Sequence, residues 1–142
     1  MDLVNYFDHH DRKGSKEHFI NLVQAASVDG VIDTSESNLL HRIGRRLGFT
    51  VPEIDKMIEN RETKIFTPPY ELEKRCHQLY DIVAMALADG VLDASEIRLI
   101  KRLAIASYFN ESEVDSLITM LVNGIEKGKD EDDLFQEFKK KR

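Results

Sequence analysis

One segment of the chain repeats itself at an offset of 60 residues, and the two copies align without a gap. Residues 22–58 match residues 82–118 at 14 of 37 positions. Each copy reads as an apolar helix, an acidic turn and two further helices, the kind of unit that repeat proteins stack to bury a common core. We therefore expect two three-helix repeats, at about residues 15–61 and 70–127, each completing the core of the other.

Apolar residues recur at helical spacing along the chain. One such stripe comprises Val114, Leu117, Ile118, Leu121, Val122 and Ile125. Steps of three and four residues indicate amphipathic helices, and the absence of sustained alternation argues against strands. The sequence predicts one all-α domain over residues 1–142. The expected helices are 15–28, 34–47, 51–61, 70–88, 94–107, 111–127 and a C-terminal one at 131–140, with a short helix near 2–9 and a linker at 63–67.

Four expected helices begin with a capping signal. The first residue of each pair accepts hydrogen bonds from free backbone amides, and an acid three positions later reaches back to it. The pairs are Asp33 with Glu36, Thr50 with Glu53, Asp93 with Glu96, and Asn110 with Glu113.

The densest identity between the copies lies in the acidic turns Asp29–Glu36 and Asp89–Glu96. One interpretation is purely structural: Gly30 and Gly90 stop a helix, and the acids that follow cap the next one. This interpretation leaves Asp29 and Asp89 without a role.

The alternative interpretation is a cation site, because the spacing matches the second half of an EF-hand calcium loop. The first half is missing, since Ala25 and Ser27 stand where the earlier acids belong. A tight EF-hand is excluded, but a weak site for Ca²⁺ or Mg²⁺, ahead of Zn²⁺, is expected if the turns meet. Its oxygen ligands would be Asp29, Asp33, Glu36, Asp89, Asp93 and Glu96.

An apolar helix ending in Ala-Asp-Gly, then Asp-x-x-Glu, repeated about sixty residues later, resembles the TerB-like group of tellurite-resistance proteins. The second copy, Ala86–Glu96, fits closely, whereas the first has Ser27-Val28 before its Asp-Gly. The resemblance covers about residues 17–122. It implies an all-helical fold, a link to stress response or tellurite resistance, and an acidic metal-binding surface formed by the six carboxylates named above.

Charge and composition exclude several classes of function. The chain carries 26 acidic and 20 basic residues, and four of the basic ones are the last residues, 139–142. Such an acidic body repels phosphate backbones, so nucleic-acid binding is not expected. No apolar stretch approaches the roughly 20 residues that membrane insertion requires. The single cysteine, Cys76, lies on an apolar stripe and suits a reducing compartment, so we expect a cytoplasmic protein.

Weaker signals receive structural interpretations. His77 follows Glu73 by one helical turn, but without the paired Glu-x-x-His motifs of di-iron bundles we interpret the two as a surface pair. The segment Asp8–Asp11 is interpreted as a solvated terminus, and Arg42 with Arg46 as a solvated helix face.

No base–nucleophile pair or phosphate loop is recognisable, so the sequence predicts a protein that is not an enzyme. The leading expectation is weak binding of a divalent cation at the paired acidic turns. The alternative is a helical protein-interaction module in which these turns are only helix caps. In either case the expected partner is a protein of unspecified identity and stoichiometry.

Overall fold

The computed structural model describes residues 12–27, 32–61, 68–88, 90 and 92–141. The described residues contain no strand, which confirms the all-helical class. Their helices are α2 (Arg12–Ala26), α3 (Thr34–Arg46), α4 (Val51–Glu59), α5 (Leu72–Leu87), α6 (Ala94–Ala106), α7 (Glu111–Glu126) and α8 (Glu131–Lys141). The expected helix at 2–9 and the linker at 63–67 lie outside the described residues.

The helix starts follow the capping signals. In α3, α4 and α6 the residue before the helix accepts from the amide three positions on, and the glutamate there accepts in return. Before α7, the amide of Asn110 donates to Glu113 at 3.0 Å. The helix α2 begins at Arg12, three residues earlier than expected, because an interior glycine such as Gly14 costs only about 1 kcal/mol.

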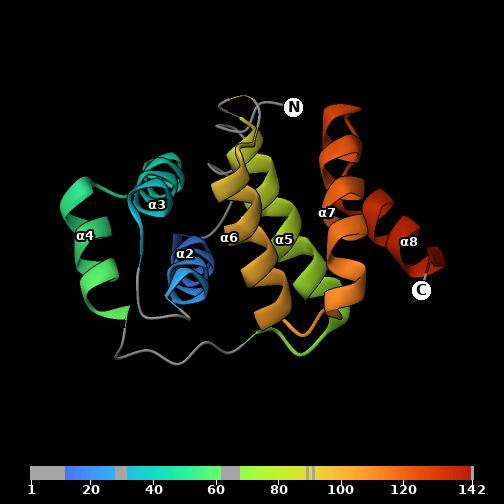
Figure 1. The fold of residues 1–142 in the computed structure, drawn as a ribbon, viewed down its shortest axis with the longest axis horizontal. Coiled ribbons are helices and arrows are strands. Elements are labelled where there is room, and N and C mark those ends of the chain that lie inside the picture. The colour runs from blue at the N-terminus through green and yellow to red at the C-terminus, as the bar shows by residue number, and fades with distance from the viewer. Residues whose placement is uncertain (1–11, 28–31, 62–67, 89, 91, 142) are drawn as a thin grey trace.

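The helices form an elongated arrangement in which α2, α3 and α4 occupy one end (Figure 1). The pair α5 and α6 lies in the centre, and α7 and α8 lie at the other end. The helix α6 packs against α2 and α3 on one side and against α5 and α7 on the other. The helix α8 packs against α5 and α7. Therefore α6 contacts helices from both halves of the chain, whereas α8 packs on helices of the second half.

One contiguous cluster of buried apolar side chains draws on all seven described helices. Leu40 and Ile43 of α3 are fully buried, as are Leu99 and Leu103 of α6. Cys76 is also buried in this cluster, as expected from its apolar stripe. Burial on this scale supplies the main driving force for folding, at about 25 cal/mol per Å² of apolar surface.

Two helix pairs approach closely at glycines. A Cβ atom on Gly44 of α3 would lie 2.7 Å from Cδ1 of Ile54 in α4. A Cβ atom on Gly124 of α7 would collide with the buried side chain of Leu134 in α8. Gly90 has φ of 122°, a left-handed value that favours glycine, as its expected role in the turn requires.

Among the described helices, none is long and apolar enough to cross a membrane.

Candidate functional site

The capping aspartates of the acidic turns are exposed and engaged with backbone amides. Oδ1 of Asp33 accepts from the amide of Glu36 at 2.7 Å, and Oδ1 of Asp93 accepts from that of Glu96 at 2.8 Å. Asp29 and Asp89 lie outside the described residues. Of the six expected cation ligands, the structure therefore places four.

The glutamates of the same turns are buried and paired with arginines from the opposite half of the chain. Oε2 of Glu36 accepts from Nη1 of Arg102 at 2.6 Å, and Oε2 of Glu96 accepts from Nη2 of Arg42. Glu36 and Glu96 are each about 5% exposed. Each arginine is thus held against the turn of the other half, and Arg42 does not lie on a solvated face as the sequence suggested.

Burial dominates the electrostatics of the two glutamates. It raises the pKa of Glu36 and of Glu96, although the neighbouring arginines act in the opposite direction. The pKa of Asp93 is lowered, chiefly because its carboxylate accepts the hydrogen bond from the backbone amide of Glu96. Backbone amides therefore engage the two aspartates, whereas the two glutamates, through their arginine partners, join α3 to α6. Cation binding by the full set of six stays a prediction.

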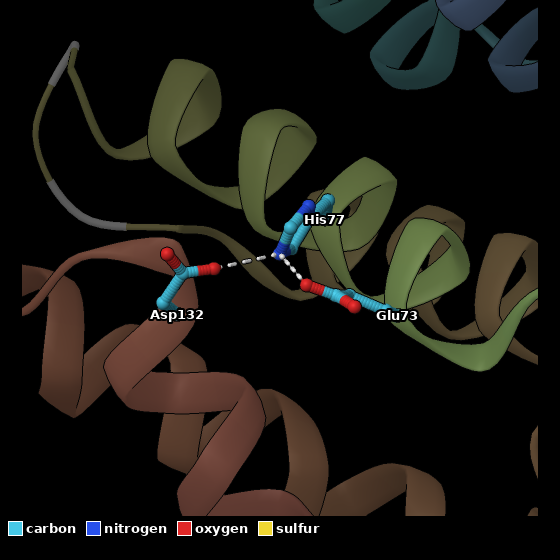
Figure 2. Close-up of side chains that lie close together, drawn as sticks. All are labelled: Glu73, His77 and Asp132. Carbon is cyan, nitrogen blue, oxygen red and sulfur yellow. Dashed lines mark ion pairs between the residues drawn. The ribbon is translucent and has the colours of Figure 1, made fainter.

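A second group of metal-ligating side chains lies between α5 and α8 (Figure 2). Glu73 and His77 lie one turn apart on α5, and Asp132 comes from the first turn of α8. Nε2 of His77 lies 3.5 Å from Oδ1 of Asp132 and 3.9 Å from Oε1 of Glu73. The three ligand atoms all lie within 4.8 Å of one another.

A cavity of about 780 Å³ is bordered by α5, α6 and α7. Its walls are mainly apolar side chains such as Leu92 and Ile118. Lys101 on its border already pairs with Asp115 at 2.7 Å. Among the described residues that line this cavity, none carries a buried, unpaired polar atom that would orient a ligand.

A second cavity, of about 700 Å³, lies between α2 and α4. We call it the α2–α4 groove and define it by Lys16, Ile20, Gln24, Lys56, Met57 and Arg61. Gln24 is 8% exposed, and neither Oε1 nor Nε2 of its amide has a hydrogen-bond partner. Buried amides are almost always paired, so an unpaired amide on a residue that lines a cavity is a candidate contact for a ligand.

Sequence reasoning found the capping residues but missed two other features. Asp132 is distant from His77 in sequence, so no local spacing could bring it into the group. The groove depends on how α4 packs on α2, which helical periodicity leaves open. Gln24 is detectable from the sequence, because it is a polar residue on an otherwise apolar helix face. The corresponding residue of the second copy is Ala84.

No protein-family model, curated protein or solved structure matches the chain. The TerB-like resemblance therefore rests on the paired sequence motif, and the function has to be argued from the side chains.

Proposed function

We propose that the chain is a non-enzymatic helical interaction module, built from two three-helix repeats, whose α2–α4 groove binds an acidic amphipathic helix of a partner protein. The observation that carries this proposal is the buried, unpaired amide of Gln24 in the groove. Leaving such an amide unsatisfied costs about 1–3 kcal/mol. A bound helix with a polar group at this position recovers that energy.

The repeat supplies the shape of the occupant. In the second half α8 covers the face formed by α5 and α7. There the ring of Phe109 lies edge-on to Phe138 of α8 at 5.7 Å, and the hydroxyl of Tyr80 donates to the carbonyl of Lys129, two residues before α8 begins. In the first half, the positions 60 residues earlier line the groove. The aligned pairs are Ile20 with Tyr80, Gln24 with Ala84, Phe49 with Phe109, and Met57 with Leu117.

No described helix follows α4 as α8 follows α7. The next one in the chain is α5, which packs against α3, α6, α7 and α8. Phe49 of the groove is the counterpart of Phe109, which contacts Phe138 of α8, so a helix resembling α8 is the occupant that we propose. The apolar side of α8 consists of Leu134, Phe135 and Phe138, all buried.

Charge points to the same occupant. Lys16, Lys56 and Arg61 border the groove, in a chain whose net charge is −6. The acid among the lining residues, Glu53, already accepts from the amide of Thr50 at 2.9 Å as part of a helix cap. The first turn of α8 is acidic, and a helix of that composition would meet this basic border. Such complementarity increases both the association rate and specificity.

A peptide of residues 129–138, which carries the acidic and apolar pattern of α8, tests this proposal. When the peptide is labelled with a fluorophore and titrated with the full chain, its fluorescence anisotropy should rise and reach a plateau. Reversing the charge of the groove border with Lys16→Glu and Lys56→Glu should weaken binding about tenfold or more. A tenfold loss is a change of about 1.4 kcal/mol in binding free energy. Lys74→Glu with Lys140→Glu is the matched control, because both lysines are exposed outside the groove and the net charge changes equally.

The chain itself contains a competing sequence. Asp2-Leu3-Val4-Asn5-Tyr6-Phe7 matches Asp133–Phe138 at the aspartate, the leucine and the final phenylalanine. The titration is therefore repeated with a chain lacking residues 1–11. Binding that appears only after this deletion would assign the groove to the chain's own N-terminal residues and contradict a partner. Equal binding by the groove variant and its control would also contradict the proposal.

We propose the acidic turns as a second, weaker site, for Ca²⁺ or Mg²⁺, in line with the TerB-like resemblance. This proposal is supported by Asp33 and Asp93, which lie exposed at helix N-termini. Replacing Asp29 and Asp89 by asparagine removes two expected ligands and leaves both described caps intact. The heat of Ca²⁺ or Mg²⁺ binding should then disappear, and a wild-type chain that shows none at millimolar ion would contradict the site.

A further inference from the structure

We infer that Glu73, His77 and Asp132 form a binding site for a transition-metal ion of the Zn²⁺ type, which would link α8 to α5. This site is separate from the acidic turns and from the α2–α4 groove. The proposal rests on the state of the imidazole, on the spacing of the three ligand atoms and on the surrounding charge.

The imidazole of His77 has one nitrogen without a hydrogen bond. Nε2 is buried from solvent and has no hydrogen-bond partner. Its distances to Asp132 and Glu73, 3.5 and 3.9 Å, exceed the 2.7–3.2 Å of an N–H···O hydrogen bond. The ring nitrogen thus lies at ion-pair distance from both carboxylates without a hydrogen bond to either, which leaves room for an ion between the three ligand atoms.

The spacing suits a small ion. Tetrahedral coordination with bonds of about 2.0 Å places ligand atoms about 3.3 Å apart. The three atoms here lie within 4.8 Å of one another, so modest side-chain rotations would bring them to that geometry. The side chains of Glu73 and Asp132 are 51% and 79% exposed, which lets an ion enter and lets water complete its coordination.

The Nδ1 side of the imidazole also lies beside residues of α8. Nδ1 lies 3.5 Å from Oε2 of Glu131, the residue next to Asp132. A carboxylate on this side favours the tautomer with the proton on Nδ1, which leaves the Nε2 lone pair for a metal. Phe135 packs edge-on against the ring, with centroids 6.3 Å apart and planes at 76°. Both residues belong to α8, so the docking of α8 orients the ligand.

The donor set selects the class of ion. One imidazole and two carboxylates suit Zn²⁺, Co²⁺ or Ni²⁺, whereas Ca²⁺ and Mg²⁺ prefer oxygen ligands alone. Three carboxylates surround the site when Glu131 is included, and they attract a cation. Three protein ligands and one water form a common Zn²⁺ arrangement. The bound ion would also hold the first turn of α8 against α5.

Calorimetric titration of the full chain with Zn²⁺ tests this inference. His9→Ala with His10→Ala is the starting background, because the segment Asp8–Asp11 also offers metal ligands. In this background we expect one ion per chain and an increase in the melting temperature. Asp132→Asn or His77→Ala should weaken binding about tenfold or more, because loss of a direct ligand costs at least as much affinity as loss of a group that only orients one.

Two variants serve as controls. His41→Ala removes a histidine that pairs with Asp55 at 2.7 Å, away from the site. Asp133→Asn removes an exposed acid from the same turn of α8. Both should bind Zn²⁺ like the background. Absence of binding at millimolar Zn²⁺, or equal binding by Asp132→Asn and Asp133→Asn, would overturn the site. Neither result depends on the peptide titration, so the two proposals can fail separately.

Discussion

Nη1 of Arg102 in α6 donates to Oε2 of Glu36 in α3 over 2.6 Å. The reciprocal pair joins Arg42 of α3 to Glu96 of α6. Both glutamates are buried, and each also accepts a hydrogen bond from the residue that precedes its helix. The same carboxylate thus caps a helix and holds the opposite helix in place, so the acidic turns have a structural role in addition to any ligand.

The Glu36–Arg102 pair should contribute measurably to stability. A double-mutant cycle with Glu36→Gln and Arg102→Met should give a coupling energy of about 1–3 kcal/mol, because the carboxylate is buried. Urea unfolding supplies the four free energies. The exposed pair Lys101–Asp115, with side chains 39% and 79% exposed, is the control and should give less than about 1 kcal/mol. Equal coupling in both pairs would contradict a special role for the buried one.

The two acids of the second capping box should respond to pH with opposite signs. The backbone amide of Glu96 holds the pKa of Asp93 below its ordinary 3.8. The contribution of Asp93 to the free energy of unfolding is therefore present above pH 3.8 and lost as pH falls through the folded pKa. Burial raises the pKa of Glu96 above 4.5. Its contribution is present below pH 4.5 and lost as pH rises through the folded pKa.

Urea unfolding of Asp93→Asn and Glu96→Gln between about pH 3 and pH 7 measures both effects. The stability advantage of the wild type over Asp93→Asn should shrink at low pH. Relative to Glu96→Gln, the wild type should instead lose stability as pH rises. Parallel profiles for the two variants would show that the caps do not titrate as described.

Gly124→Ala should loosen α8 selectively. A Cβ atom at this position collides with Leu134, which is 1% exposed and cannot easily move aside. Overpacking of this kind costs about 1–3 kcal/mol. Hydrogen exchange should accelerate in α8 and remain unchanged in α3. Ser116→Ala, at an exposed position of α7, is the control, and unchanged protection of α8 in Gly124→Ala would contradict the predicted close approach.

Gln24→Leu should separate stability from binding. Replacing a buried, unpaired amide with an apolar side chain of similar size should raise the free energy of unfolding by about 1 kcal/mol. It should also weaken the binding of the peptide of residues 129–138, because the groove loses its polar group. Gln78 is the matched control, since its amide is also buried and unpaired but the residue does not line the groove. Gln78→Leu should stabilise the chain without changing its affinity for the peptide.

The helices and their starts could be predicted because caps such as Asp33 with Glu36 act over three residues. The tertiary contacts of the same side chains could not. Nothing local to Arg42 indicates that it contacts Glu96, so the sequence alone places this arginine on a solvated helix face. Asp132 joins His77 only because α8 packs against α5, and the sequence therefore showed the histidine with one acid instead of two. The 60-residue offset shows which residues of the two copies correspond in sequence. Which of them are covered by another helix depends on tertiary packing, which the offset does not predict.

We propose that the first half of the chain keeps open a binding site like the one that α8 occupies in the second half. Amide NMR of the full chain, titrated with the peptide of residues 129–138, locates the bound peptide residue by residue. Chemical-shift changes should concentrate at Ile20, Gln24 and Met57 and be small at Glu36 and Glu96. Changes confined to α5 and α7, or no change at saturating peptide, would contradict it.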